Sequence, residues 1–316
     1  MTLQKIPLRI EPIDIAARYH HIRSVPQQPN FAARIEGLDL TRPIGDAVRR
    51  ELYQALLDFE VLFFPPQQIT PEQHVALAGV FGEIAPGAFF PRKDGHPDVE
   101  VIEFNAQRPP EINIWHSDLT WLPEPPNGTV IQITELPAQG GNTAWASLSK
   151  AFAALSPGLQ TYLEGLSATH TWEISGWRDA LEKYAGVDAL ADALRKYKPV
   201  SRPVVRVHPE SGRKVLFVNE NFTKHIDGVH FRESRGLLEF LREWIVQPEF
   251  TYQHKWEPNG LAVWDNRTTQ HYALTDYWPH RRVTQRVTFN AFGSAPTTQS
   301  TRAAVVADAR AGAITA

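Results

Sequence analysis

The chain has 316 residues, with 32 Lys and Arg against 35 Asp and Glu, which gives a formal net charge of −3 at pH 7. A weakly acidic chain has no general attraction for nucleic acid or for anionic membrane surfaces, so we expect neither as a partner. It contains no cysteine, which excludes disulfides and thiolate metal sites and leaves His and carboxylate groups to bind any metal.

Two helices and one apolar strand are predicted near the start of the chain. Residues 46–59 repeat apolar side chains at helical spacing, and the apolar run 61–64 that follows is typical of a strand. Thr70 and Gln73 match a capping box, with a proline between them that fits the first helical turn. We expect this second helix to run to about Phe81.

Short runs of β-branched and aromatic residues predict the strands that follow. They lie at 99–104, 129–134, 204–207, 215–218, 261–264 and 283–292. Many short strands after two early helices predict a mainly β fold with helices (α+β). Its core would be a double-stranded β-helix, a cupin-like jelly roll, with flanking helices.

We expect one domain over residues 1–316, because no linker rich in Gly, Ser or Pro divides the chain. Its core would span about 30–293, followed by a mobile tail at 294–316. The stretch 156–198 interrupts the strand pattern with helical segments, and we expect an insertion near the active site, where such insertions often form lids. The sequence has no signal-type apolar segment and no membrane span, so we expect a cytoplasmic protein.

The segment His116-Ser117-Asp118 is the first candidate metal site. With 12 His and 35 acidic residues in the chain, one His-x-Asp arises easily by chance, and a solvated polar pair is the alternative. Residues two apart on an extended chain point the same way, so His116 and Asp118 can face one ion while Ser117 faces away. His271 offers a second imidazole. Two imidazoles and one carboxylate leave three coordination positions open, as a non-haem Fe(II) oxygenase requires.

A candidate anion site lies on the last predicted strand, where polar and apolar side chains alternate. The even positions are His280, Arg282, Thr284, Arg286 and Thr288, and the odd ones include Val283, Val287 and Phe289. On a sheet that faces solvent, the two arginines would form a solvated edge. On a strand whose polar face looks inward, they would need partners, and a bidentate carboxylate is the natural one. The residues alone leave both interpretations open.

Four segments resemble the taurine dioxygenase family of Fe(II)- and 2-oxoglutarate-dependent oxygenases. They are Trp115-His116-Ser117-Asp118, Gly140-Gly141-Asn142-Thr143, Val218-Asn219-Glu220-Asn221-Phe222 and Trp264-Asp265-Asn266-Arg267-Thr268-Thr269-Gln270-His271-Tyr272. Arg282 and Arg286 follow His271 by eleven and fifteen positions, which is the family's spacing, and the resemblance extends from about Gly37 to Phe292. It implies an enzyme that uses Fe(II), takes 2-oxoglutarate and O₂ as co-substrates, and releases succinate and CO₂.

The resemblance also implies roles for the matched residues. The implied iron ligands are His116, Asp118 and His271. Thr143 and Arg282 would hold the distal carboxylate of 2-oxoglutarate. Arg286 would lie nearer the metal, close to the co-substrate and to the anionic group of the substrate. No catalytic residue is expected beyond the metal site, and Asp265 would help to orient the loop that carries His271.

Two positions bear on the substrate. Family members that accept taurine have polar residues where this chain has Gly87 and Ile112. Without these hydrogen-bonding groups, the ammonium of a small zwitterion would be desolvated without a partner, so taurine is disfavoured. We expect an organic anion with an apolar body, such as an alkyl or aryl sulfonate, a sulfate ester or an aryloxyalkanoate, with C–S or C–O cleavage. Candidate substrate residues are Phe90, Ile112, Phe222, Arg286, Trp172 and Trp177, although the two tryptophans could equally be core aromatics.

Two other classes of protein stay open. A jelly roll with a His-Asp-His site could bind another metal and act as a hydrolase or isomerase, but neither activity needs a second anion site at Arg282 and Thr143. A binding protein on the same fold would not need an open iron site. The family resemblance also implies a homo-oligomer, either a dimer or a tetramer.

Overall fold

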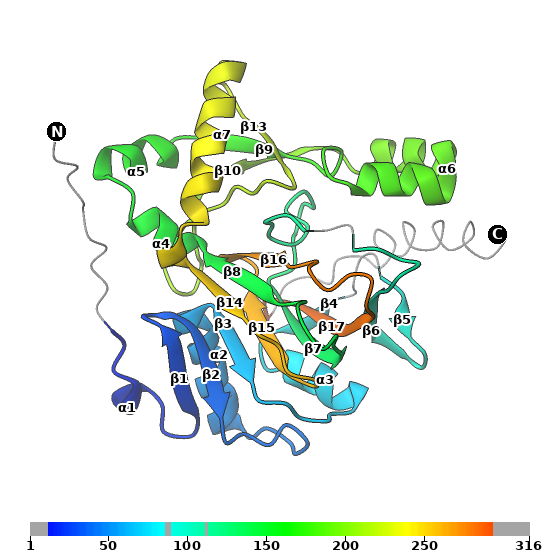
Figure 1. Ribbon diagram of the computed structural model, residues 1–316. Coiled ribbons are helices and arrows are strands. Elements are labelled where there is room, and N and C mark those ends of the chain that lie inside the picture. Colours follow the sequence, from blue (N-terminus) through cyan, green and yellow to red (C-terminus); the bar gives the residue numbers. More distant parts are fainter. Residues whose placement is uncertain (1–11, 86–89, 111–112, 293–316) are drawn as a thin grey trace.

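The computed structural model describes residues 12–85, 90–110 and 113–292. It is a mixed α/β protein built around one large sheet (Figure 1). The strand order of this sheet is β1-β2-β3-β15-β7-β17-β6-β5, and β4 also pairs with β17. Its strands are β1 (Arg23–Gln28), β2 (Phe31–Glu36), β3 (Val61–Phe64), β4 (Glu83–Ala85), β5 (Arg92–Lys93), β6 (His96–Phe104), β7 (Gly128–Glu135), β15 (Leu261–Asp265) and β17 (Arg282–Asn290). Strands β2 and β3 pair in parallel, whereas β15, β7, β17 and β6 pair antiparallel.

A second sheet packs against the large one. It consists of β14 (Thr251–His254), β8 (Thr143–Ser147) and β16 (Thr269–Ala273), in the order β14-β8-β16. In β3 of the large sheet, Leu62 and Phe64 contribute to one hydrophobic cluster while Val61 and Phe63 contribute to another. Trp145 of β8 belongs to the latter cluster, and its ring lies edge-on to Phe63 at 5.3 Å between centroids. Because both faces of β3 are buried, its sequence is a continuous apolar run rather than an alternating one.

Helices cover the other face of the large sheet (Figure 1). They are α2 (Asp46–Phe59) and α3 (Pro71–Ala78), and a short α1 (Ile15–Arg18) precedes them. Leu52 and Leu56 of α2 pack in the same cluster as Val263 of β15. The predicted capping box is confirmed, since the Thr70 hydroxyl accepts from the Gln73 N–H and the Gln73 side chain accepts from the Thr70 N–H.

A third layer lies at the top of Figure 1. Its elements are α4 (Leu148–Ala153), α5 (Pro157–Glu164), α6 (Trp177–Lys196), α7 (Phe231–Ile245), η1 (Pro248–Phe250), the sheet β10 (Val200–Pro203)-β9 (Ser167–His170)-β13 (Thr223–Ile226), and the hairpin β11 (Val205–Val207)-β12 (Lys214–Leu216). Apolar side chains of α4, α5 and α7 share one hydrophobic cluster with β9, β12 and β13. This layer contributes several side chains to the site described below.

The structure contains the helical segments predicted in 156–198, as α5 and α6. The same stretch also contains β9, which was not predicted and which pairs with β10 and β13. The helix expected to reach Phe81 ends at Ala78, after which Val80 and Phe81 continue in three-residue turns. Other elements that were not predicted include the hairpin β1–β2, the helix α7, the strands β4, β5, β10 and β13, and the whole second sheet β14-β8-β16, which carries His271. The tail 294–316 lies outside the described residues.

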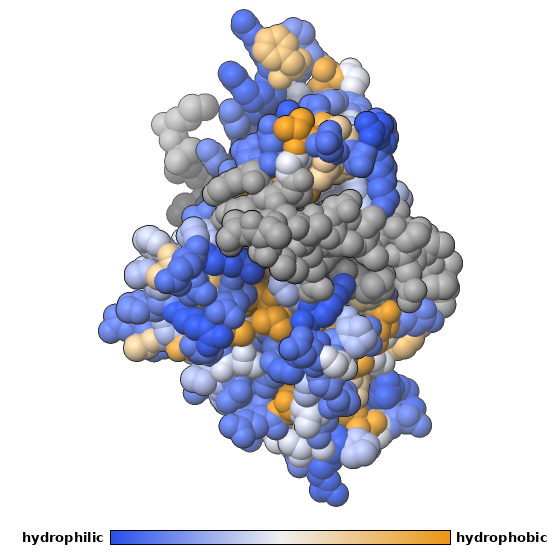
Figure 2. Space-filling view, turned by 90° about the vertical axis from the view of Figure 1, so that its right-hand side faces the viewer, coloured by the Kyte–Doolittle hydropathy of each residue, from blue (hydrophilic) through white to orange (hydrophobic). Residues whose placement is uncertain are grey.

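The described surface is mostly hydrophilic on the face shown in Figure 2, where hydrophobic residues appear in small separate patches. Within the described ranges, no helix is both long enough and apolar enough to cross a membrane.

Candidate functional site

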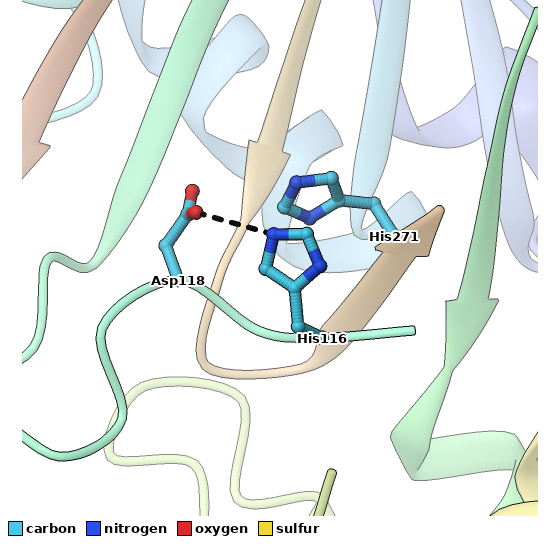
Figure 3. A group of neighbouring side chains, drawn as sticks. All are labelled: His116, Asp118 and His271. Atoms are coloured by element: carbon cyan, nitrogen blue, oxygen red, sulfur yellow. Dashed lines mark ion pairs between the residues drawn. The ribbon is translucent and has the colours of Figure 1, made fainter. Parts of the chain in front are cut away.

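Two imidazoles and one carboxylate converge beside the small sheet. His116 lies on a loop, His271 lies on β16, and the two residues form an isolated antiparallel bridge. The His116 N–H donates to the His271 carbonyl at 3.1 Å, and the His271 N–H donates back at 2.8 Å. Asp118 points toward the two rings from the same loop as His116 (Figure 3). One ligand atom from each of the three residues lies within 4.8 Å of the others, which is the spacing of a metal site.

The ring nitrogens of His116 have different roles. Nδ1 lies 2.8 Å from the Ile114 carbonyl, which can only accept, so Nδ1 carries the proton. Nε2 then carries a lone pair, the form that can bind a metal, and lies 3.7 Å from Asp118 Oδ1. A hydrogen bond from the ring nitrogen that does not face the metal fixes the tautomer and the orientation of a metal-binding imidazole.

Two side chains connect the loop of His116 and Asp118 to the start of β16 and to the turn before it. The Ser117 hydroxyl faces away from the cluster, as expected, and donates to the Thr269 carbonyl at 2.7 Å. The Asn266 amide accepts from the Asp118 N–H at 2.6 Å and donates to the Asp118 carbonyl at 2.9 Å. It also donates to the Pro126 carbonyl at 2.9 Å. Asn266 was not singled out in the sequence, although it lies in the matched segment that carries His271.

Asp265 shapes the turn from β15 to β16. Its buried carboxylate accepts from the Arg267 backbone and guanidinium at 2.6–2.9 Å and lies 3.0 Å from His208 Nε2. Burial acts to raise the pKa of this carboxyl, but Arg267 and His208 outweigh it and hold the pKa below its ordinary value. The expectation that Asp265 orients the loop of His271 therefore has a structural basis.

The electrostatic setting favours the metal-binding forms of the cluster. Burial would raise the pKa of Asp118, but His271, Arg286 and His116 together keep it below its ordinary value, so the group is a carboxylate. Burial, with help from His116 and Arg286, lowers the pKa of His271 to about 3, against the opposing effect of Asp118. An ionised carboxylate and a neutral imidazole are the forms that bind a cation. Asp118 Oδ2 and His271 Nδ1 are buried without a hydrogen-bond partner among the described residues.

Arg282 lies in the same cavity but has no carboxylate contact among the described residues. Its Nη1 donates to Thr284 Oγ1 at 3.0 Å, and its buried Nε has no hydrogen-bond partner there. Gly141, at φ +71°, lets the backbone pass so close that a Cβ would lie 3.3 Å from the Arg282 Nε. Burial lowers the pKa of this guanidinium, which is the cost of desolvating an unpaired cation. An incoming anion would relieve that cost.

Thr143 lines the cavity with its hydroxyl already oriented. The Trp256 indole N–H donates to Thr143 Oγ1 at 3.0 Å. Because the hydroxyl oxygen accepts this bond, its own hydrogen is left to point at another acceptor. Trp256 was not recognised in the sequence, since it lies outside the four matched segments, eight residues before Trp264.

Arg286 is held by an acidic residue that sequence reasoning missed. Its Nε donates to Glu100 Oε2 at 2.8 Å, and its Nη2 lies 2.6 Å from the same oxygen. Asp118 Oδ1 is 3.9 Å from its Nη1, and the Phe90 ring lies 5.0 Å from its guanidinium carbon. Burial would lower the pKa of Arg286, but Glu100 and Asp118 keep it above its ordinary value. The strand predicted at 99–104 contained Glu100, but no sequence signal placed it opposite Arg286.

The candidate substrate residues are divided between the cavity and its surroundings. Phe90, Trp177 and Phe222 line the cavity together with the His-Asp-His cluster and both arginines. Trp172 lies instead in a hydrophobic cluster behind Phe222, where its indole N–H donates to the Tyr197 carbonyl at 3.3 Å. Ile112, like Gly87, lies outside the described residues.

Comparisons with known proteins agree on one family. Residues 23–288 match the family described as Taurine catabolism dioxygenase TauD, TfdA family. An alkylsulfatase of Acinetobacter baylyi is 31% identical over 263 residues, 82% of this chain and 81% of the relative. An (S)-phenoxypropionate/alpha-ketoglutarate-dioxygenase of Sphingobium herbicidovorans is 32% identical over 82% of this chain and 91% of its own. The crystal structure of a putative alpha-ketoglutarate-dependent taurine dioxygenase from Burkholderia xenovorans superimposes with a TM-score of 0.73 at 34% identity, covering 85% of this chain and 92% of that one.

Proposed function

Since the chain belongs to the taurine catabolism dioxygenase TauD, TfdA family, it is an Fe(II)- and 2-oxoglutarate-dependent dioxygenase, and we propose that His116, Asp118 and His271 bind its iron. The observation that carries this proposal is the convergence of two imidazoles and one carboxylate within 4.8 Å. This donor set suits Fe(II) and leaves three coordination positions for co-substrate and O₂. A bound cation would account for Asp118 Oδ2, which is buried without a hydrogen-bond partner among the described residues.

We further propose that Arg282 and Thr143 hold the distal carboxylate of 2-oxoglutarate. Both side chains line the cavity of the His-Asp-His cluster, and each has a hydrogen-bond donor to offer. Arg282 supplies charge through its Nε, which no described residue engages in a hydrogen bond. Thr143 supplies a hydroxyl whose orientation is set by Trp256. Charge-assisted bonds of this kind are the strong ones in carboxylate recognition.

When bound, Fe(II) with 2-oxoglutarate and O₂ supplies the oxidising chemistry, which converts the co-substrate to succinate and CO₂ and hydroxylates the substrate. The residues of the chain bind and orient the reactants and keep water out of an apolar cavity. No proton transfer by a side chain is required, so neither Asp265 nor Glu100 is given an acid or base role.

We propose an organic anion with an apolar body as the substrate. The named relatives act on a sulfate ester or a phenoxypropionate, both of which fit that description. The cavity supports it, since the aromatic side chains of Phe90, Trp177 and Phe222 line it beside Arg286. Hydroxylation of the carbon next to oxygen or sulfur in such a compound leads to C–O or C–S cleavage.

The finer description of the fold is also a proposal. Two packed sheets with Trp145 and Phe63 between them support a double-stranded β-helix core with flanking helices. A single domain and a homo-oligomeric state stay predictions, and sedimentation of the purified protein would measure the latter.

The alternatives, a hydrolase, an isomerase or a binding protein, are not favoured, because the relatives are dioxygenases. Two experiments test the choice. Anaerobic addition of Fe(II) and 2-oxoglutarate should give a weak visible charge-transfer band. A screen of alkyl sulfates, sulfonates and aryloxyalkanoates should then release succinate in air. The absence of the band from metal-loaded protein would contradict the iron site, and taurine as by far the best substrate would contradict the substrate class.

A further inference from the structure

The ion pair between Glu100 and Arg286 lies directly beside the proposed iron site. Strand register places Glu100 of β6 opposite Arg286 of β17. The Glu100 side chain is 1% exposed, and its Oε2 receives both the Nε contact at 2.8 Å and the Nη2 contact at 2.6 Å from Arg286. A buried carboxylate at this position therefore occupies one full edge of the guanidinium.

The remaining donors of Arg286 face a second negative charge. Its Nη1 lies 3.9 Å from Asp118 Oδ1. A substrate anion would have to bind an arginine whose Nε edge is taken and whose Nη1 is close to a carboxylate. A cation that is already paired gains less from a new anion than an unpaired one, because the charges partly cancel before the ligand arrives.

Glu100 also holds the aromatic wall of the cavity. Its Oε1 accepts from the Phe90 N–H at 3.3 Å and lies 3.6 Å from Arg92 Nη1. Arg92 is the more distant partner, and its side chain is 25% exposed. The Phe90 ring packs over Arg286 at 5.0 Å and lies edge-on to Trp177 at 6.0 Å. One carboxylate thus fixes both the cation and the apolar surface that a substrate would contact.

We propose that Glu100 determines substrate specificity: by occupying the Nε edge of Arg286, it weakens recognition of the anionic group, so that the apolar body must supply most of the binding free energy. This inference rests on the proposed function and defines its substrates as anions with long or bulky apolar bodies. Compact anions bind poorly because they have no such body to offer.

The test is Glu100→Gln, which removes the charge but keeps the size and a hydrogen-bond acceptor. Binding of straight-chain alkyl sulfates to the protein with Fe(II) and 2-oxoglutarate would be measured anaerobically by calorimetry, alongside uncharged n-octanol. We expect the variant to bind each alkyl sulfate about tenfold more tightly, since hydrogen bonds to charged groups are of that strength. That gain in binding free energy equals the burial of about two methylene groups. The variant should therefore bind an alkyl sulfate two carbons shorter as tightly as the wild type binds the longer one. Binding of octanol should not change.

A matched control is available on β6 and at the residue that precedes β17. Glu103 of β6 pairs with Arg281 at 2.8 Å, next to Arg282, but this pair is partly exposed and neither residue lines the cavity. Glu103→Gln should therefore leave the alkyl sulfate series unchanged. Glu100→Asp retains the charge but withdraws it from Arg286, so it should give a smaller gain in affinity in the same direction. This variant keeps the test available if Glu100→Gln does not fold.

Equal affinities of the wild type and both Glu100 variants for the series, with the charge-transfer band intact, would overturn the inference and leave the proposed function standing. If the wild type bound no alkyl sulfate, sulfonate or aryloxyalkanoate and released succinate with none of them, the proposed substrate class would be wrong and the inference would fall with it.

Discussion

Arg282 and Arg286 lie on the same face of β17, yet their surroundings are opposite. The contacts of Arg282 are the Thr284 hydroxyl at 3.0 Å and the Tyr277 ring at 5.8 Å, and its Nε is buried without a hydrogen-bond partner in the described parts of the chain. Arg286 is paired with Glu100 and also approaches Asp118.

The contrast indicates two modes of recognition in one cavity. An unpaired buried cation binds a carboxylate through a full charge, whereas a paired cation leaves selection to shape and apolar contact. The Arg282 region is therefore suited to an invariant co-substrate, and the Arg286 region to a variable organic body.

The largest effect should come from Asp118→Ala, which removes one of the proposed iron ligands in the cavity that both arginines line. We expect succinate release to fall by more than about 100-fold, because even residues that only orient a metal ligand cost about 10–100-fold. Fe(II) affinity should fall in parallel. Asp98→Ala, an exposed carboxylate on β6, is the control. Wild-type activity of Asp118→Ala would show that the ligand assignment is wrong.

Arg282→Ala tests the co-substrate region. The loss of two charge-assisted hydrogen bonds of about 1.5–3 kcal/mol each should raise the KM for 2-oxoglutarate by about 100-fold or more. The neighbouring Arg281 is half-exposed and paired with Glu103 outside the cavity, so Arg281→Ala should behave as wild type. A similar KM for 2-oxoglutarate in Arg282→Ala and Arg281→Ala would contradict the assignment of the Arg282 region to the co-substrate.

Asn266→Ala tests how the Asp118 side of the site is held. Without the amide that pairs with the Asp118 backbone, Fe(II) affinity should fall about tenfold, while turnover at saturating iron changes less. Asn266→Asp keeps the hydrogen-bond acceptor but loses the donor to the Asp118 and Pro126 carbonyls. Its Fe(II) affinity should lie between those of the wild type and Asn266→Ala. Direct titration with Fe(II) would measure these affinities. An unchanged affinity in Asn266→Ala would show that Asn266 does not position Asp118 for iron binding.

Trp256→Phe should give the smallest effect, confined to the Arg282 region. Loss of the indole donor leaves the Thr143 hydroxyl free to rotate, which should raise the KM for 2-oxoglutarate by about 2–10-fold. In a Thr143→Val background the same change should add nothing, since the hydroxyl is already absent. Equal effects in both backgrounds would mean that Trp256 acts through packing alone.

Several features could be predicted because they depend on neighbours in the chain. The Thr70 capping box is encoded within four residues, and the alternation after residue 280 does place Arg282, Thr284 and Arg286 on the cavity side of β17. A local pattern could not show which of Trp172 and Trp177 lines the cavity. One packs behind the cavity and the other lines it, and only the path of the chain between β9 and α6 decides which.

The sequence by itself determined the donor set and the reaction class, because His116 and Asp118 share one side of an extended segment and the matched segments identify the family. Tertiary structure alone decided which charges meet. The pairing of Glu100 with Arg286 depends on the register of β6 against β17, and the contact of Trp256 with Thr143 depends on how β14 and β8 align. Such register depends on the hydrophobic patterns of both strands and on the geometry of the connections between them, so a motif around one residue does not identify its partner on the next strand.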